Sequence, residues 1–496
     1  MARPGNPVHQ TGTVAIAMLL LLVATGLYLV LLYRVGSRFA SVARLAGDPW
    51  LGAWIRSLHR YASDLFVIAA ALHALRMFAQ ARSWGPRAIA WGSGFMLFGA
   101  GVACAWTGFI MAWDSFGERL AREGARLLDA LPVLSEPLSR IFAGDQPVPS
   151  AFFFVNLFVH LAVPLVMAAG VWLHVARVAR PVLLPPRRLL WILTGGLIAI
   201  AVAVPAPLGP PADVFHLAPA TPVDVTVAWW LPLSERLAPG AVWAAMLSTA
   251  FAVLLVPRVR RRPREGRLAP SVVDPRLCTG CNQCPQDCPW EAITMVPRED
   301  GRPSLLARVD PSRCVSCGIC AGSCAPMGIG PPGRSGRDQL AAVRTVPDLA
   351  AAAGAPLVAI HCEQVPAAHV SALHARDASV HPVSCVGNLH TSAIEFLVRS
   401  GVPGVLVCGC PPRDCASREG PKWLHERVFT DREAELQARV DRRVRLATCA
   451  PGDLAGTMAS FDAFARDLGT LDRVDRDNDG ESEALCDPVS IHRAAS

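Results

Sequence analysis

Apolar residues are concentrated in the first half of the chain, where they form long runs. A helix needs about 20 apolar residues to cross the hydrocarbon core of a bilayer. We expect such helices at 13–33, 58–80, 88–112, 152–176, 189–207 and 239–257. No small-residue cleavage site follows the first run, which therefore predicts a retained helix and not a signal peptide. The pattern thus predicts an all-α bundle of six transmembrane helices.

The second half has the shorter, mixed runs of a soluble protein. Segments 356–360, 402–407 and 444–448 have the apolar pattern of buried strands, and 392–400 has that of a helix. Strands that alternate with helices favour a small parallel sheet. Segment 336–355 is rich in Ala, Gly and Pro and is typical of a linker.

These patterns divide the chain into four parts. We expect a membrane domain over 1–265, a small cysteine-rich domain over 266–335, an α/β domain over 336–463 and a polar, disordered tail over 464–496.

The distribution of charge gives the predicted bundle an orientation. The chain contains 47 Lys and Arg and 40 Asp and Glu, a net charge of +7. Arginines cluster beside the apolar runs in 81–87, 177–188 and 258–264, whereas the loops 114–150 and 208–238 are more acidic. The positive-inside rule then predicts a multi-pass protein of a bacterial or archaeal cell (inner) membrane, with both termini and the cysteine-rich half in the cytoplasm. The arginines at 34, 38, 44 and 56 depart from this rule. No nucleic-acid partner is expected, because membrane anchoring accounts for the positive charge.

Four histidines lie inside the apolar runs. The second run contains His59 and His73, and the fourth contains His160 and His174. Each pair is fourteen residues apart, close to four helical turns, so its members share one face about 21 Å apart. A single intramembrane histidine more often makes a hydrogen bond between helices, but two identical spacings favour cofactor ligands. We expect His59 to face His160 and His73 to face His174, as two bis-imidazole haem sites. No Cys-x-x-Cys-His motif occurs, which predicts non-covalent b-type haem.

Fifteen of the sixteen cysteines lie from Cys278 onward, and eight of them have iron–sulfur spacing. Two runs repeat the pattern Cys-x2-Cys-x2-Cys-x3-Cys. Such a pair is typical of a bacterial-type, α+β ferredoxin with two [4Fe–4S] clusters, in which the fourth cysteine of each run binds the other cluster. The expected ligand sets are Cys278, Cys281, Cys284 with Cys324, and Cys314, Cys317, Cys320 with Cys288. The alternative, a pair of structural zinc sites, explains this order of eight cysteines less well.

Six further cysteines follow the predicted strands of the α/β domain. They are Cys362, Cys385, Cys408, Cys410, Cys415 and Cys449. Isolated cysteines are usually inert core residues. Their clustering at strand ends, and the short loop from Cys410 to Cys415, favour a bound cofactor.

The membrane half resembles the N-terminal half of cytochrome b from quinol–cytochrome c oxidoreductases, over residues 10–115 and 150–180. The matching stretches are Trp54-Ile55-Arg56-Ser57-Leu58-His59, Leu72-His73-Ala74-Leu75-Arg76, Thr107-Gly108-Phe109 with Trp113-Asp114, and His160 followed by Pro164. The resemblance implies a di-haem cytochrome b. It continues more weakly at 208–213, which resembles the start of an outer loop that carries Pro-Glu-Trp-Tyr in the family. This chain has Val227-Ala228-Trp229-Trp230 there, and loss of the carboxylate argues against quinol oxidation on the outer side.

Residues 356–430 resemble the delta subunit of methyl-viologen-reducing hydrogenase, which delivers electrons to heterodisulfide reductase. The resemblance rests on Ile360-His361-Cys362, Val383-Ser384-Cys385-Val386-Gly387 and Gly404-Val405-Leu406-Val407-Cys408-Gly409-Cys410 through Cys415. It implies one [2Fe–2S] cluster held by Cys362, Cys385, Cys410 and Cys415, with Cys408 as a competing ligand.

The three parts in series predict an electron-transfer subunit of a quinone-linked membrane oxidoreductase in a respiratory chain. Its partners would be quinone or quinol and a cytoplasmic flavoprotein or dehydrogenase, and its membrane domain is a candidate homodimer surface. Two alternatives are a component of a disulfide reductase like heterodisulfide reductase and a membrane redox sensor. The first is disfavoured because the chain has no adjacent Cys-Cys pair, and the second because it has no output domain.

Overall fold

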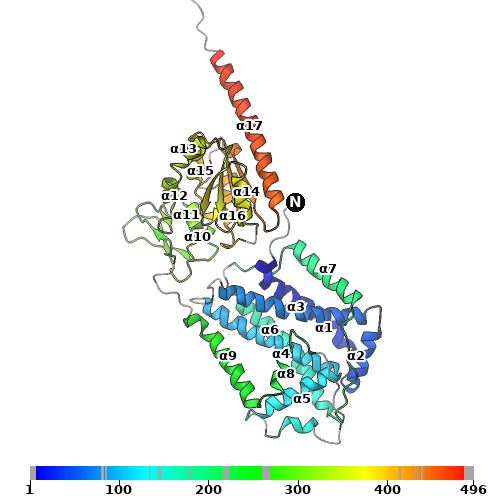
Figure 1. Ribbon diagram of the computed structural model, residues 1–496. Coiled ribbons are helices and arrows are strands. Elements are labelled where there is room, and N and C mark those ends of the chain that lie inside the picture. The colour runs from blue at the N-terminus through cyan, green and yellow to red at the C-terminus, as the bar shows by residue number, and fades with distance from the viewer. Residues whose placement is uncertain are drawn as a thin grey trace, which may run out of the picture. The chain divides into compact units, whose positions relative to one another are not determined.

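The computed structural model describes residues 7–79, 83, 87–132, 135–142, 147–176, 178, 180–215, 223–259, 268–412, 415–430, 432, 434–436 and 440–484. The chain divides into two compact units between Glu265 and Gly266. In Figure 1 the colour of the first unit runs from blue to green, and that of the second from green to red.

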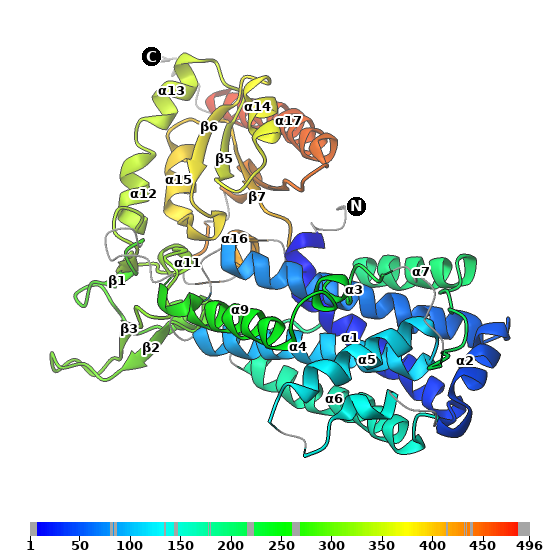
Figure 2. The same cartoon turned by 60° about the horizontal axis from the view of Figure 1, so that its bottom comes forward.

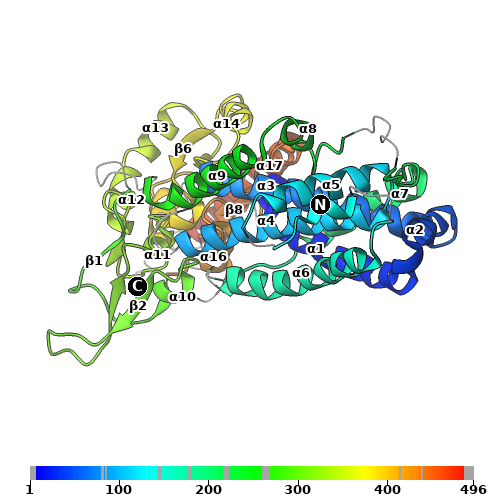
Figure 3. The ribbon, with the colours of Figure 1, turned by 90° about the horizontal axis from the view of Figure 1, so that it is seen from below.

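The first unit is helical. Its α-helices are α1 (Thr11–Leu32), α2 (Arg38–Gly47), α3 (Gly52–Ala79), α4 (Arg87–Ala112), α5 (Ser115–Asp129), α6 (Ser150–Ala176), α7 (Arg187–Ala203), α8 (Leu231–Ser234) and α9 (Pro239–Val259). Short 3-10 helices are η1 (Pro7–Gln10), η2 (Val35–Ser37) and η3 (Leu138–Phe142). Within the described residues, five helices are long and apolar enough to cross a membrane: α1 (with η1 residues from Val8), α3, α4, α6 and α9. Helix α1 packs along α3, and α4 along α6, so that the long helices lie side by side (Figure 3).

The fifth expected segment, 189–207, forms the shorter helix α7. It has 17 residues and ends at Ala203. Pro205 and Pro207 follow, and proline cannot continue a helix because it lacks the backbone N–H and clashes with the preceding turn. The α-helical membrane bundle is therefore present, and the count of six crossings stays a prediction.

A loop of the first unit is fastened to the start of α5. Asp114 precedes α5, and its carboxylate accepts hydrogen bonds from the backbone N–H of Gly117 and of Gly209, both at 2.9 Å. The first bond is a helix N-cap, which stabilises a helix by about 1 kcal/mol. The segment that begins the weaker cytochrome b resemblance is thus held against Asp114.

The second unit begins with a small cysteine-rich fold. Strand β1 (Val272–Val273) pairs antiparallel with β4 (Ile329–Gly330), and β2 (Ile293–Val296) pairs antiparallel with β3 (Leu306–Val309). Two short helices, α10 (Gln283–Asp287) and α11 (Ile319–Gly322), follow the first cysteines of the two runs. The two halves therefore repeat one strand–helix pattern around the cysteines.

An α/β domain follows, and the predicted parallel sheet is confirmed. Its strands are β5 (Val358–Cys362), β6 (Ser379–Val383), β7 (Val405–Gly409) and β8 (Val444–Thr448), in the order β6-β5-β7-β8 and all parallel. Its helices are α12 (Gly336–Ala342), α13 (Val346–Ala352), α14 (Ala367–His374), α15 (Thr391–Arg399), α16 (Gly420–Phe429) and α17 (Leu454–Ala484), with η5 (Val386–Asn388) and η6 (Asp441–Arg443). Helix α15 lies on one side of the sheet, and α14 and α17 lie on the other (Figure 2).

Two sequence-based boundaries differ from the structure. The segment 336–355 is not an open linker, because it forms α12 and α13, and a capping box between Ser335 and Asp338 begins α12. The polar tail does not start at 464 either, because α17 runs on to Ala484 and buries Phe464 and Leu468 in the core of the α/β domain. Apolar residues spaced three and four apart give α17 an apolar stripe. Residues 485–496 lie outside the described residues.

Candidate haem and iron–sulfur sites

The structure brings His59 of α3 and His160 of α6 together inside the helical unit. Their ring centroids are 6.4 Å apart, and the rings are inclined by 60°. Both histidines lie well inside helices that are long and apolar enough to cross a membrane. Helices α3 and α6 thus present two imidazoles to one point, as a bis-histidine haem site requires.

Each of the four histidines packs against a glycine of a neighbouring helix. A Cβ added to Gly26 or Gly108 would lie 3.2 or 2.9 Å from the Cε1 atom of His59 or His160. A Cβ added to Gly12 or Gly94 would lie 2.9 or 3.1 Å from the Cε1 atom of His73 or His174. Only glycine, which has no side chain, therefore leaves the space beside each histidine open. This observation fits residues that surround a large, flat cofactor.

The sequence carries a signal for these glycines, although motif reasoning missed it. Gly12 and Gly26 on α1 are fourteen residues apart, as are Gly94 and Gly108 on α4, which is the spacing of the histidines. Recognising these glycines requires the knowledge that α1 packs against α3 and α4 against α6, and the sequence alone does not show this pairing.

Hydroxyl groups orient three of the four imidazoles. The Nδ1 atom lies 2.9 Å from Thr25 Oγ1 in His59, 3.1 Å from Thr107 Oγ1 in His160 and 3.0 Å from Ser93 Oγ in His174. Each hydroxyl already donates to a backbone carbonyl of its own helix, to Leu21, Cys104 and Ala90 respectively. Each hydroxyl is therefore placed to accept from Nδ1–H, which leaves Nε2 as the free ligand atom. The Nδ1 atom of His73 has no hydrogen-bond partner within the described residues.

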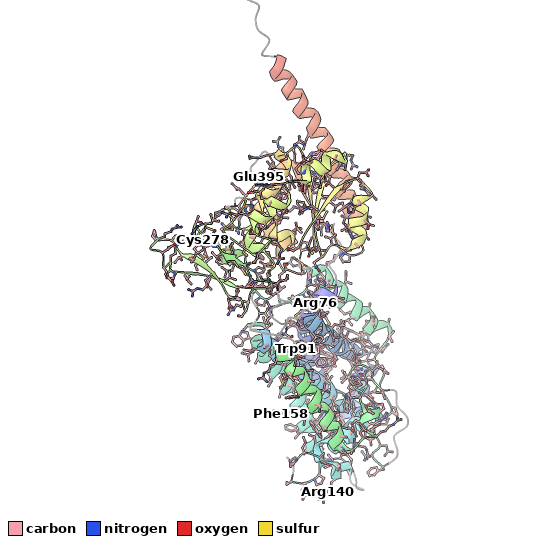
Figure 4. The ribbon with its side chains drawn as sticks, turned by 60° about the vertical axis from the view of Figure 1, so that its left-hand side comes forward. Arg76, Trp91, Arg140, Phe158, Cys278 and Glu395 are labelled. Carbon is pink, nitrogen blue, oxygen red and sulfur yellow. The ribbon has the colours of Figure 1, made fainter. Side chains whose placement is uncertain are left out.

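The two cysteine runs exchange their fourth members. Cys288 of the first run lines one cavity together with Cys314, Cys317 and Cys320 of the second run. Cys324 instead interacts electrostatically with Cys278 and Cys281 of the first run, and Cys284 interacts with these three cysteines and with Cys320. Figure 4 labels Cys278 in this domain. The structure therefore places Cys288 beside the second run and Cys324 beside the first, and the two complete ligand sets stay a prediction.

Several features of these thiols suit iron–sulfur ligation. Backbone N–H groups donate to Cys288 Sγ from Ala292, to Cys314 Sγ from Ser316 and to Cys324 Sγ from Gly328, at 3.3 to 3.4 Å. Such bonds stabilise negative charge on sulfur. Burial, with the neighbouring cysteines, raises the pKa values of Cys284, Cys317 and Cys320 far above their ordinary range. Grouped, buried thiols are costly to ionise without a metal, and metal binding removes their protons. Within the described residues, no three His, Cys, Asp or Glu side chains converge closely enough for a single metal ion.

Four cysteines of the α/β domain form a third group. Cys410 Sγ lies 3.9 Å from Cys362 Sγ, and the Cys415 thiol hydrogen-bonds with both Cys410 and Cys385. The bond that Cys410 donates lowers the pKa of Cys362, while the pKa of Cys410 is raised to about 12. Gly420 makes room for this group, because an added Cβ would lie 2.6 Å from Cys385 Sγ. The four ligands that the hydrogenase resemblance implies thus meet at the carboxyl edge of the sheet.

The competing ligand Cys408 is placed elsewhere. It lies within β7, fully buried, and its thiol pairs with Cys449 after β8. Residues two apart in a strand point to the same face of the sheet. Cys408 and Cys410 would share a face if β7 continued, but β7 ends at Gly409 and Cys410 lies beyond it. The backbone turn after Gly409 carries Cys410 to Cys362 and leaves Cys408 with Cys449.

Three family models match successive parts of the chain. Residues 6–181 match the family model "Cytochrome b/b6/petB", residues 277–328 match "4Fe-4S dicluster domain" and residues 358–472 match "Methyl-viologen-reducing hydrogenase, delta subunit". The chain joins segments of three families. With the five apolar helices, these matches make it a membrane electron-transfer protein that binds haem b and iron–sulfur clusters.

A solved structure described as "Hyperthermophilic respiratory Complex III" is similar to part of the chain. The similarity covers 52% of this chain and 77% of that one, at 17% sequence identity and a TM-score of 0.39.

Proposed function

We propose that this protein relays electrons between a cytoplasmic flavoprotein or dehydrogenase and the quinone pool. In this proposal His59 with His160 and His73 with His174 hold two b haems. Two [4Fe–4S] clusters are held by the two exchanged cysteine sets, and one [2Fe–2S] cluster is held by Cys362, Cys385, Cys410 and Cys415. The order from the partner is [2Fe–2S], the [4Fe–4S] pair, the inner haem and then quinone or the outer haem.

The observation that carries the proposal is the pairing of His59 with His160 inside apolar helices. An ionisable side chain within a membrane is costly, so two that face each other point to a common ligand. Gly26 and Gly108 keep side chains away from these imidazoles, and Thr25 and Thr107 fix the ring nitrogen that faces inward. Haem and iron–sulfur groups, when bound, take up and release single electrons. The residues of this chain orient the ligands and exclude water around them.

Quinone chemistry is proposed on the inner side only. In the outer-loop segment Val227 and Ala228 are buried and Trp229 is 68% exposed, and none of the three offers a carboxylate. The nearby Asp224 accepts hydrogen bonds from the backbone N–H of Thr226 and Val227 and is paired with Arg60. Its carboxylate is therefore engaged in holding the loop, which supports the absence of outer-side quinol oxidation.

The deciding experiment is a reduced-minus-oxidised visible spectrum with pyridine haemochrome quantification on the purified membrane protein. We expect about two b haems per chain and loss of haem in His59→Ala and His73→Ala. His374→Ala, which changes an exposed histidine of α14, is the control and should keep both haems. A wild-type protein without haem would refute the proposal and leave the four histidines as contacts between helices.

A further inference from the structure

One arginine is completely buried between the cysteine-rich domain and the α/β domain. Arg427 of α16 is 1% exposed. Its Nη1 donates to Ser323 Oγ at 2.8 Å and to the Ile319 carbonyl at 3.2 Å, and its Nη2 donates to the Gly387 carbonyl at 2.7 Å. Gly322 leaves the space for the guanidinium, since a Cβ there would lie 2.7 Å from Nη1 and Nη2. The surrounding residues therefore leave space for the guanidinium and accept its hydrogen bonds.

The groups that Arg427 contacts adjoin proposed cluster ligands from both domains. Ile319 and Ser323 precede Cys320 and Cys324, and Gly387 follows Cys385 by two residues. The two ligand loops are also neighbours, because a Cβ added to Gly387 would lie 2.9 Å from Ile319 Cγ1. One side chain thus holds the ligand loop of the second cysteine set beside that of the third.

The charge of Arg427 is not in direct contact with a carboxylate among the described residues. Asp287, which precedes Cys288, is fully buried, accepts from Ser323 Oγ at 2.6 Å and forms an ion pair with Arg432. Arg432 is also 3.7 Å from a carboxylate oxygen of Glu426, so it has two carboxylate partners, whereas Arg427 forms no ion pair within the described residues. Burial lowers the pKa of Arg427 to about 10, and Asp287 and the thiols of Cys385 and Cys320 act in the opposite direction. The guanidinium therefore stays charged at neutral pH.

A buried charge without compensation is costly, so a site that keeps one points to an anionic neighbour. Nearby charge and hydrogen bonding set the reduction potential of an iron–sulfur group. A fixed cation favours the reduced form of such a group, because reduction adds one negative charge. Cys320 of the second [4Fe–4S] set and Cys385 of the [2Fe–2S] set both lie close enough to interact electrostatically with this cation.

We propose that Arg427 is a positioning residue that couples the second [4Fe–4S] site to the [2Fe–2S] site and raises the reduction potentials of both. This inference rests on the cluster assignments of the proposed function. In the coupled step one electron leaves the reduced site and enters the oxidised site, and no bond forms or breaks. A purely structural role for Arg427 would hold the two domains together without changing the potentials.

The test is an EPR-monitored redox titration of the full-length protein in detergent, with iron and acid-labile sulfide measured on each sample. In Arg427→Met we expect reduction of both sites to become about tenfold less favourable, which is about 59 mV for a one-electron couple. Arg427→Lys keeps the charge and should restore most of this shift. Arg376→Met is the matched control, because Arg376 pairs with Asp462 at 2.8 Å elsewhere on the α/β domain, and its potentials should equal those of the wild type.

The possible results distinguish an electrostatic role of Arg427 from a purely structural one. Unchanged potentials in an Arg427→Met protein that holds its full iron overturn the inference. If Arg427→Met loads no iron, Asp287→Asn decides, because removal of a negative charge at the same site must raise the potentials; unchanged or lowered potentials there overturn it. A wild-type chain without cluster iron overturns the proposed function itself, which separates the two failures.

Discussion

Glycines lie opposite the histidines, and the proposed haem sites need the space that these glycines leave open. Gly108 and Gly99 both lie on α4, but a Cβ on Gly108 would lie 2.9 Å from His160 Cε1, whereas no atom lies within 4 Å of one on Gly99. Overpacking of a filled site costs about 1–3 kcal/mol. Gly108→Val should therefore displace the His160 ring and lower the pyridine haemochrome value from about two haems per chain to about one.

Gly99→Val is the control for this prediction. It adds the same β-branched side chain to the same helix, so it tests helix propensity without the contact, and both haems should remain. Equal haem content in the two variants would show that the open space at Gly108 is not needed for binding.

At the scale of single residues, spacing in the sequence identifies the candidate ligands but not the residues that support them. The histidines and the eight ferredoxin-type cysteines are recognisable by fixed spacing, because one element must deliver several ligands to one point. Thr25, Ser93 and Arg427 act across helices or domains, and their partners are distant in sequence. Their roles become visible only when the packing of the elements is known.

The turn after β7 separates two cysteines that are two residues apart in sequence. Cys410 meets Cys362 at 3.9 Å, whereas Cys408 pairs with Cys449. We therefore expect Cys410→Ser to abolish the [2Fe–2S] signal in the EPR spectrum of the reduced protein. Cys408→Ser, which makes the same change at a fully buried strand position, should retain the signal, and the reverse outcome would exchange their roles.

Elements of the α/β domain were predictable where their apolar runs were continuous. Strands β5, β7 and β8 lie close to their expected positions, but β6 was missed because His381 and Pro382 interrupt its apolar pattern. Pro382 is tolerated because β6 is at the edge of the sheet, with a partner on one side only. The composition of α12, α13 and α17 did not predict their structure, because these Ala-rich or polar segments form helices that pack against the core. Local composition gives only the intrinsic helix propensity of a segment, whereas the stability of these helices depends on the surface against which they pack.

For the molecule as a whole, the side of the membrane on which the iron–sulfur unit lies depends on α7. Its 17 residues span about 26 Å, slightly less than the hydrocarbon core of about 30 Å. It exposes Trp191, Ile200 and Val202 at 74, 51 and 60%, as Phe158, labelled in Figure 4, is exposed on the spanning helix α6. Apolar side chains exposed in this way suit contact with lipid, and Arg187 and Arg188 begin the helix at the end that the positive-inside rule places in the cytoplasm.

We therefore predict that α7 crosses the membrane, which gives six crossings and puts both termini in the cytoplasm. Alkaline phosphatase fused after Arg236, between α7 and α9, should be active, because that enzyme folds only outside the cytoplasm. A fusion after Arg180, before α7, should be inactive whether or not α7 crosses, and it serves as the control. Green fluorescent protein at the C-terminus should fluoresce. An inactive fusion after Arg236 together with a dark C-terminal fusion would show that α7 lies along the surface. The iron–sulfur unit would then face the outside, away from any cytoplasmic partner, and the proposed relay would have no flavoprotein or dehydrogenase to exchange electrons with.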